Sequence, residues 1–231
     1  MKAVITGASG FLGTHVKKYL LALSGEQSCQ VLTLGRSDSL AEMTEKMTAF
    51  QPDVVFHLAT VFVAEHTDDD LERLVDANLL FGLKVLQAMQ KSGCRKLVNT
   101  GTHWQNWNGE RGTPVSLYAA TKNAFEELIR YFVSADDFQV LNLRLCDTYG
   151  EDDPRGKIIA KLIELSQSGG AGSFSPGEQL IDLTHQSDVM RGLVHAAKML
   201  IADQTEQGFM KVFVLSSGEK QSLREVAALV E

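Results

Sequence analysis

Short runs of apolar residues recur along the first 150 positions of the chain, and longer segments with a helical period separate them. The apolar runs are unbroken rather than alternating, as residues 54–59 (VVFHLA) illustrate. Unbroken runs are typical of strands that are buried on both faces of a parallel sheet, and the segments between them are long enough for crossover helices. We therefore predict an α/β fold with a doubly wound parallel sheet, whose strands cover residues 3–5, 30–34, 54–59, 96–100 and 139–144.

The clearest helical periods cover residues 76–91 and 117–132, where apolar residues recur at every third or fourth position. After residue 150 the regular rhythm gives way to turn-forming segments. We therefore expect a first domain over residues 1–150 and a smaller region over residues 151–231, whose chain interleaves with the first. A capping-box pattern (SLRE) starts a last helix at Ser222, and the apolar stripe of that helix has no evident partner. This region is therefore expected to be truncated at the C-terminus.

The composition of the chain narrows the possible partners. Its 231 residues carry 22 Lys and Arg against 29 Asp and Glu, a formal net charge of −7, and no basic cluster is visible, so nucleic acid is not expected as a partner. No apolar run approaches the ~20 residues of a membrane span, and no leader precedes the first strand, so we expect a cytoplasmic protein without membrane insertion. The three cysteines are far apart and the histidines are not paired at ligand spacing, which predicts neither disulfides nor a metal site.

Three glycines follow the first predicted strand and open the first helix. Gly7, Gly10 and Gly13 form a G-x-x-G-x-x-G pattern, which allows a tight turn, close approach of the main chain to a ligand and close contact between helix and strand. Backbone N–H groups and the positive end of the helix dipole would then face a pyrophosphate. The alternative is a glycine-rich turn in another kind of α/β domain.

The end of the second strand bears on the choice of dinucleotide. Enzymes that use NAD usually place Asp or Glu here, where the carboxylate binds the ribose hydroxyls. In this chain Gly35, Arg36 and Ser37 follow the strand. A guanidinium suits a 2′-phosphate, so we expect NADP(H) to be preferred over NAD(H), with Arg36 and Ser37 as its ligands. The alternative is that Arg36 points into solvent.

Tyr118 and Lys122 lie four positions apart on a predicted helix, so their side chains share one face and can meet at one reacting atom. A lysine ammonium beside a phenol favours the phenolate, and we expect it to lower the pKa of Tyr118 from about 10 toward the working pH. Such a phenol can donate a proton to a substrate oxygen or accept one from it. The pair therefore predicts acid–base catalysis of an interconversion between C–OH and C=O.

Several motifs together resemble the extended short-chain dehydrogenase/reductase family that acts on nucleotide sugars, the NAD-dependent epimerase/dehydratase family. They occur in order along nearly the whole chain: residues 6–13, 57–59, Asn78, the Tyr118 and Lys122 pair, Arg144 with residues 149–150, and residues 184–189. The resemblance implies a Rossmann-like sheet followed by a small substrate region, with the active site between them. It also implies a homodimer that packs through helices 76–91 and 117–132.

The resemblance assigns roles to individual residues. It implies Thr100 as the third catalytic residue beside Tyr118 and Lys122, with Thr102 as the second choice. Lys122 is also expected to bind the nicotinamide ribose. The other cofactor-binding residues that it implies are Gly7, Ser9, Gly10, Phe11, Leu12, Gly13, Leu58, Ala59, Thr60 and Asn78.

Departures from the family pattern indicate the reaction. Sugar 4,6-dehydratases carry Asp-Glu directly after the threonine, where this chain has Gly101 and Thr102, so dehydration is not expected. Residues 99–105, 117–122 and 147–150 are most similar to CDP-abequose and CDP-paratose synthases, which are NADPH-dependent 4-ketoreductases of CDP-linked deoxyhexoses in O-antigen synthesis. The alternatives are a nucleotide-sugar 4-epimerase with tightly bound NAD, and a non-catalytic, NADP-sensing protein with this fold.

The expected substrate site combines aromatic and charged residues. Thr102, His103 and Trp104 are expected near the sugar, whereas Arg155 and Lys157 offer cations to its diphosphate in an otherwise acidic protein. A solvated helix start is the alternative for the two cations. Asp147 stands where many relatives carry an Asn that contacts the nucleotide sugar.

Overall fold

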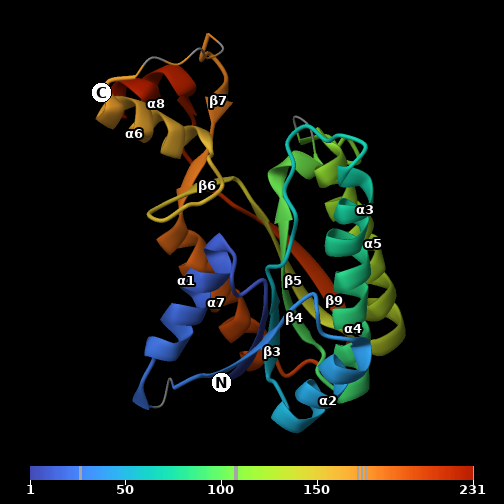
Figure 1. The fold of residues 1–231 in the computed structure, drawn as a ribbon. Coiled ribbons are helices and arrows are strands. Elements are labelled where there is room, and N and C mark those ends of the chain that lie inside the picture. The colour runs from blue at the N-terminus through green and yellow to red at the C-terminus, as the bar shows by residue number, and fades with distance from the viewer. Residues whose placement is uncertain (26–27, 107–108, 171, 173, 175, 231) are drawn as a thin grey trace.

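The computed structural model describes residues 1–25, 28–106, 109–170, 172, 174 and 176–230. A six-stranded parallel sheet runs through its middle in the order β2-β1-β3-β4-β5-β9 (Figure 1). The predicted α/β fold with a doubly wound parallel sheet is thereby confirmed. The five predicted strands differ from the observed ones only at their ends, whereas the sixth strand, residues 209–215, was not predicted. The strands are β1 (Lys2–Thr6), β2 (Gln30–Leu34), β3 (Val54–His57), β4 (Lys96–Thr102), β5 (Gln139–Leu145) and β9 (Phe209–Leu215).

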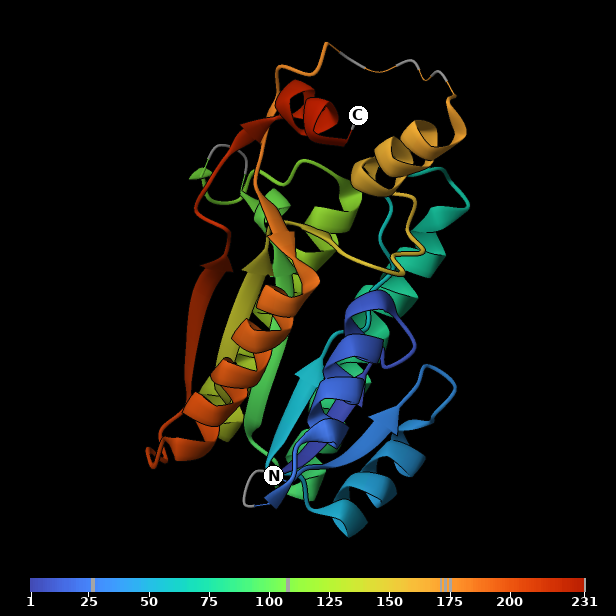
Figure 2. The same cartoon turned by 90° about the vertical axis from the view of Figure 1, so that its left-hand side faces the viewer.

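Helices cover both faces of the sheet (Figures 1 and 2). Successive residues of a strand point to opposite faces, so Ile5 and Phe56 enter one core while Val4 and Val55 enter the other, and all four are fully buried. The unbroken apolar runs reflect this burial on two sides. One face carries α1 (Phe11–Ala22) and α7 (Gln186–Ala202), and the other carries α2 (Leu40–Phe50), α4 (Phe81–Ser92) and α5 (Leu117–Asp136).

The predicted helix over residues 76–91 is part of a longer helical segment with a change of pitch. The segment begins as α3 (Asp70–Val75), widens into one π-helical turn, η2 (Asp76–Leu80), and continues as α4. The 3.6-residue period of the apolar positions gave no sign of the extra residue in this π turn. Such turns frequently occur at functional sites, and this one carries Asn78 at the end of the sheet where the cofactor residues were expected.

The C-terminal part of the chain both completes the sheet and builds a small region beyond one end of it. A short connection, β6 (Asp147–Tyr149), pairs in parallel with β8 (Leu183–His185), while β7 (Leu180–Ile181) pairs antiparallel with β10 (Gln221–Ser222). Above them α6 (Ile158–Ser168) lies against α8 (Leu223–Val230) (Figure 1).

The last helix begins with the predicted capping box. The Glu225 amide donates to the Ser222 hydroxyl at 3.2 Å, and the Ser222 amide donates to the Glu225 carboxylate at 2.8 Å. Within the described residues, no helix combines the length and the apolar character needed to cross a membrane.

Candidate functional site

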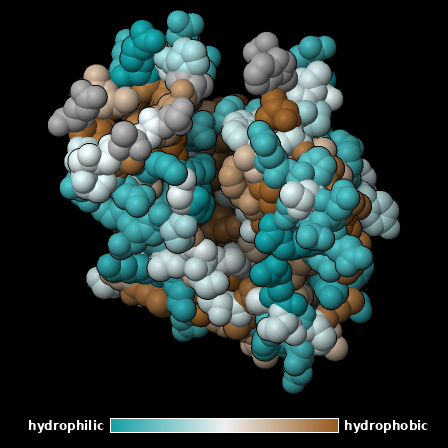
Figure 3. Space-filling view, turned by 45° about the horizontal axis from the view of Figure 1, so that its top comes forward, coloured by the Kyte–Doolittle hydropathy of each residue, from teal (hydrophilic) through white to brown (hydrophobic). Residues whose placement is uncertain are grey.

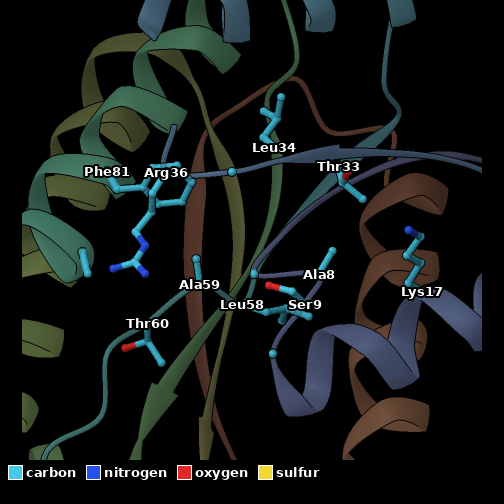
Figure 4. A pocket seen from close by; sticks show the side chains of 14 residues that line it. Ala8, Ser9, Lys17, Thr33, Leu34, Arg36, Leu58, Ala59, Thr60 and Phe81 are labelled. Carbon is cyan, nitrogen blue, oxygen red and sulfur yellow. The ribbon is translucent and has the colours of Figure 1, made fainter. Parts of the chain in front are cut away.

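The glycine turn forms the floor of a cavity of about 550 Å³ at the carboxyl ends of β1 and β2 (Figure 4). Gly7 adopts a left-handed φ of +70°, and a Cβ there would lie 2.7 Å from the main chain of Ala59. A Cβ on Gly13 would lie 2.0 Å from the Gly7 carbonyl oxygen. Only glycine fits at these two positions, and the resulting contact brings the N-terminus of α1 to the cavity. This cradle fits the pyrophosphate of a dinucleotide.

The adenosine end of the same cavity is bordered by cationic rather than acidic side chains. Arg36 reaches the cavity from the loop after β2, and Lys17 of α1 lies on its opposite side (Figure 4). Asp38, the nearest carboxylate in that loop, accepts instead from the Gly35 amide and from Lys46. None of the described residues that border this cavity is acidic. Ser37, which was expected to bind the 2′-phosphate together with Arg36, does not border this cavity.

A second cavity of about 400 Å³ continues from the first, since both are bordered by Gly7, Gly10, Leu58 and Thr60. The hollow is visible in Figure 3 between the two halves of the surface, with hydrophobic residues at its base. The expected residues that the structure brings to this cavity are Phe11, Leu12, Gly13, Thr100, Thr102, His103, Trp104, Tyr118, Asp147, Arg155 and Lys157.

The end of β4 presents two threonines to the second cavity. Thr100 and Thr102 point to the same face of the strand; the Thr100 hydroxyl donates to the His57 carbonyl at 3.1 Å, and the Thr102 hydroxyl accepts from the Trp104 amide at 3.3 Å. A Cβ on Gly101, between them, would lie 2.5 Å from the Gln105 side-chain oxygen. A side chain at this position would therefore displace the Gln105 side chain from the hydrogen bonds that it makes here.

The titration of the tyrosine and lysine pair differs from the sequence-based expectation. Burial raises the pKa of Tyr118 to about 12, although a hydrogen bond with Thr60 and the charge of Arg155 act in the opposite direction. Burial also lowers the pKa of Lys122 to about 8, with Glu126 opposing the shift. The prediction that Lys122 lowers the pKa of Tyr118 was wrong, because burial has the largest effect on the phenol and raises its pKa. Tyr118 is a neutral phenol, which suits proton donation.

A buried ion-pair network holds the catalytic helix against the end of the sheet. Glu126, one turn beyond Lys122 on α5, accepts from Arg144 through both carboxylate oxygens, at 3.0 and 2.7 Å. It also accepts from Asn142 at 2.7 Å and from Gln105, whose own side-chain oxygen accepts from the Thr102 amide. The network therefore connects the α5 helix to the strand end that presents the two threonines.

Asn78 lies beneath the cofactor loop rather than in a cavity. Its side-chain oxygen accepts from the Thr60 hydroxyl at 3.0 Å and from the Val61 amide at 2.7 Å. Its side-chain nitrogen donates to the Val61 carbonyl and to the Thr121 hydroxyl, each at 3.0 Å. The amide is thus fully used within the chain, and Asn78 acts on the site by positioning Thr60. Lys122, like Asn78, borders neither cavity within the described residues.

The two cations expected at the substrate diphosphate have protein partners in the structure. Arg155 forms a two-pronged ion pair with Asp153, at 2.6 Å for each contact, and its guanidinium lies 4.4 Å from the centre of the Phe11 ring. Lys157 lies 3.7 Å from Asp147. Both cations nevertheless border the second cavity, so they face the space in which a substrate would lie.

Sequence reasoning missed Phe62, which lies directly against Tyr118. Its ring meets the Tyr118 ring edge-on at 5.1 Å and lies 5.6 Å from the Trp104 ring. Lys17 was missed as well. Neither residue belongs to a local motif, and only the position of Phe62 shortly after the end of β3 gave a hint.

Comparison with known proteins agrees with this geometry. The model of the NAD dependent epimerase/dehydratase family matches residues 3–209. CDP-abequose synthase of Yersinia pseudotuberculosis is 27% identical over 207 residues, which cover 84% of this chain and 72% of that protein. UDP-glucose 4-epimerase of Mycolicibacterium smegmatis is 25% identical over 228 residues, which cover 85% and 73%.

Solved structures share the fold over the entire chain. UDP-glucose 4-epimerase of Thermus thermophilus in complex with NAD has a TM-score of 0.81 at 23% identity, covering 100% of this chain and 82% of that one. UDP-glucuronic acid 4-epimerase of Bacillus cereus has a TM-score of 0.83 at 20% identity, with the same coverage. With the glycine cradle and the Tyr118 and Lys122 pair, the family match leads to one conclusion: the chain belongs to the NAD-dependent epimerase/dehydratase family.

Proposed function

We propose that the protein is an NADPH-dependent reductase of the 4-keto group of a nucleotide-linked deoxyhexose. The observation that carries the proposal is the position of Tyr118, a buried neutral phenol at a cavity that joins the dinucleotide cradle. A phenol there can protonate an oxygen on a sugar held between the cradle and the aromatic residues. The similarity to CDP-abequose synthases supports a CDP-linked sugar.

Each residue at the site has a distinct task in this reaction. Tyr118 donates its proton to the ketone oxygen, and the Thr100 hydroxyl, with Thr102 as the alternative, orients that oxygen once its proton turns from the His57 carbonyl to the substrate. Lys122, whose pKa is lowered to about 8 by burial, is expected to bind the ribose of the cofactor. When bound, NADPH would supply the two electrons and one hydrogen that convert the ketone to an alcohol. The second hydrogen comes from Tyr118, which regains a proton from solvent.

The preference for NADP(H) rests on charge at the adenosine end of the cradle. Arg36 borders the cavity beyond the end of β2, where the 2′ position is expected to lie, and Asp38 is engaged by Lys46 and Gly35. A guanidinium without a competing carboxylate favours a 2′-phosphate over free ribose hydroxyls. At the other end, Arg155 and Lys157 are proposed to bind the diphosphate of the sugar nucleotide.

A 4-epimerase is the second candidate, because UDP-glucose 4-epimerases are among the similar sequences and folds. An epimerase must keep its cofactor through a full cycle, so it would purify with tightly bound NAD. The reductase would exchange its cofactor freely. Analysis of the nucleotide released by denaturing the purified protein separates the two functions.

The direct test follows loss of NADPH absorbance with a panel of CDP-, dTDP- and GDP-linked 4-keto-6-deoxy and 4-keto-3,6-dideoxy sugars. Turnover with one of them is expected, and the Tyr118→Phe variant should lose about 10²–10⁴-fold in rate while it still binds NADPH. Full activity of Tyr118→Phe would contradict the mechanism. No oxidation by a folded, NADPH-binding protein would contradict the reductase function.

We also propose a cytoplasmic homodimer that packs through η2, α4 and α5, as is usual in the family. Leu80 and Leu83 expose 45% and 36% of their surface there, and Tyr131 of α5 exposes 66%. A second copy would cover these apolar side chains. Sedimentation analysis showing only a monomer would contradict the dimer.

A further inference from the structure

Thr60 lies next to the reacting phenol, although the family resemblance assigns it only to the cofactor. It follows the end of β3 and borders both cavities, and Figure 4 shows it beside the first one. Two residues later the Phe62 ring meets the Tyr118 ring edge-on at 5.1 Å, so this loop packs against the tyrosine. A hydrogen bond joins the Thr60 hydroxyl to the Tyr118 phenol. Tyr118 is only 8% exposed, so its phenol is buried against a side chain that is itself open to the cleft.

The hydrogen bonds around Thr60 have a defined direction. The Thr60 hydroxyl has one proton, which it donates to the Asn78 side-chain oxygen at 3.0 Å, so its own oxygen is left to accept from the phenol. The amide of Asn78 is fixed in this orientation, because its nitrogen donates to the Val61 carbonyl and to the Thr121 hydroxyl. Thr121 in turn donates to the Tyr118 carbonyl at 2.7 Å. The series of hydrogen bonds therefore begins at the Tyr118 phenol and returns to the main chain of the same residue.

Proton donation by Tyr118 changes what its phenol oxygen requires from Thr60. The phenol O–H bond breaks, a new O–H bond forms on the substrate oxygen, and the electron pair of the broken bond stays on Tyr118 as a phenolate. A phenolate can only accept hydrogen bonds, and in a buried site it needs a donor from the protein. Rotation about the C–O bond of Thr60 turns its proton from Asn78 to the phenolate. The Asn78 oxygen keeps a partner, because it also accepts from the Val61 amide at 2.7 Å, so the rotation leaves no unpaired acceptor behind.

We propose that the Thr60 hydroxyl stabilises the phenolate that forms on Tyr118 during proton donation, and that Asn78 holds Thr60 in position for this step. Thr60 keeps its own proton throughout, and the phenolate is protonated again from solvent. This inference rests on the proposed function, because it takes Tyr118 as the proton donor. The hydrogen bond with Thr60 acts to lower the pKa of Tyr118, which burial raises, as expected of a group that favours the phenolate.

The test compares variants at position 60 that differ in the hydroxyl. Thr60→Val keeps the branched shape and removes the hydroxyl, whereas Thr60→Ser keeps the hydroxyl. Thr48→Val is the matched control, because Thr48 of α2 is also exposed and borders neither cavity. The kcat and KM are measured with NADPH and the 4-keto sugar that the panel identifies, and the Kd for NADPH is measured by fluorescence.

Thr60→Val should lower kcat about tenfold to hundredfold, because a charge-assisted hydrogen bond to the phenolate is lost. Its KM and its Kd for NADPH should stay within about threefold of the wild-type values, since the phenolate forms only during the reaction. Thr60→Ser should restore most of the rate, and Thr48→Val should match the wild-type protein in all three quantities.

A spectroscopic measurement tests the contact without turnover. The chain has four tyrosines, so the ring carbon that carries the hydroxyl can be labelled with ¹³C in all of them, and Tyr118→Phe assigns the Tyr118 signal. The chemical shift of this carbon responds to the hydrogen bonds of the phenol. Thr60→Val should move the Tyr118 signal, whereas Thr60→Ser and Thr48→Val should leave it close to its wild-type position.

Several results overturn the inference alone. They are a wild-type kcat in Thr60→Val, a loss of rate that Thr60→Ser does not restore, and a Tyr118 signal that Thr60→Val leaves in place. An effect confined to the Kd for NADPH also overturns it and assigns Thr60 to cofactor binding. If the wild-type protein reduces none of the 4-keto sugars, the proposed function fails, and the role of Thr60 in the reaction fails with it.

Discussion

The two ends of the cleft are built from different parts of the chain. The dinucleotide end is bordered mainly by main chain and small residues, such as Gly7, Gly10, Ala59 and Ala77. The sugar end is bordered by large side chains, including Phe62, Trp104 and Arg155. Backbone amides recognise any pyrophosphate, whereas side chains can distinguish one sugar from another. We therefore expect the choice of sugar to depend on side chains at one end of the cleft, while the main chain at the other end binds the pyrophosphate.

The largest effect is expected where the main chain itself forms the cradle. Gly13→Ala would place a Cβ 2.0 Å from the Gly7 carbonyl oxygen, which forces α1 away from β1. We expect a loss of more than about 4 kcal/mol in the free energy of unfolding and loss of dinucleotide binding. Urea unfolding and NADPH fluorescence titration measure the two effects. Gly93→Asn is the control, since Gly93 is a left-handed helix end with open space around it; equal stability of the two variants would contradict the close contact.

The second largest effect is expected from the buried ion-pair network of Glu126 and Arg144, which supports the sugar end of the cleft. Glu126→Ala leaves the Arg144 guanidinium without its partner in a mostly buried site, and we expect a loss of about 3–5 kcal/mol in unfolding free energy. Turnover should fall as well, because Gln105, which accepts from the Thr102 amide, loses its contact with Glu126. Glu127→Ala is the matched control, since the next side chain along is 75% exposed. A Glu126→Ala protein as stable as the control would show that the network is dispensable.

Lys122 lies buried on α5, four residues after Tyr118, and its burial gives a pH-dependent prediction. Burial lowers its pKa to about 8, so between about pH 8 and the usual 10.5 the unfolded chain binds a proton that the folded protein does not. Charging Lys122 therefore destabilises the fold below pH 8, and this cost disappears as pH rises to 10.5. Lys122→Met should abolish turnover yet raise the free energy of unfolding at pH 7 by up to about 3 kcal/mol.

Urea unfolding of Lys122→Met at pH 7 and at pH 10 provides the measurement. The gain in unfolding free energy should be smaller at pH 10 than at pH 7. Lys91→Met, at an exposed position, should give no comparable gain at either pH. A Lys122→Met protein that is less stable than wild type at pH 7 would mean that the ammonium is well compensated in the fold.

The smallest effect is expected from Arg36, whose guanidinium borders the dinucleotide end of the cleft. Arg36→Ala should raise the Kd for NADPH by about tenfold to hundredfold and leave the Kd for NADH nearly unchanged, because only NADPH carries the 2′-phosphate. Arg73→Ala, which alters a surface pair with Asp70, is the control and should change neither value. Equal weakening of both cofactors by Arg36→Ala would contradict the preference for NADP(H).

The difference between local motifs and tertiary packing also explains which site residues the sequence could predict. The glycine turn and the Tyr118 and Lys122 pair are set by spacing along one segment, so their place in the fold was predictable. Phe62 and Lys17 reach the cleft only through tertiary packing, and no local pattern identifies them. The pKa of Tyr118 was predicted in the wrong direction, because it depends on how much water the folded chain removes from the phenol.

The π turn at η2 also bears on how the length of this chain can vary. The turn accommodates one residue more than an α-helix would, so α3 and α4 are out of phase with a single straight helix. Deleting one residue from this turn would restore the α period and rotate α3 by about 100° relative to α4. Leu74 would then leave the core and the Asn78 side chain would lose its four hydrogen bonds to Thr60, Val61 and Thr121. Substitutions can therefore accumulate on the outer surface of this segment, whereas a change of even one residue in its length would be eliminated by selection.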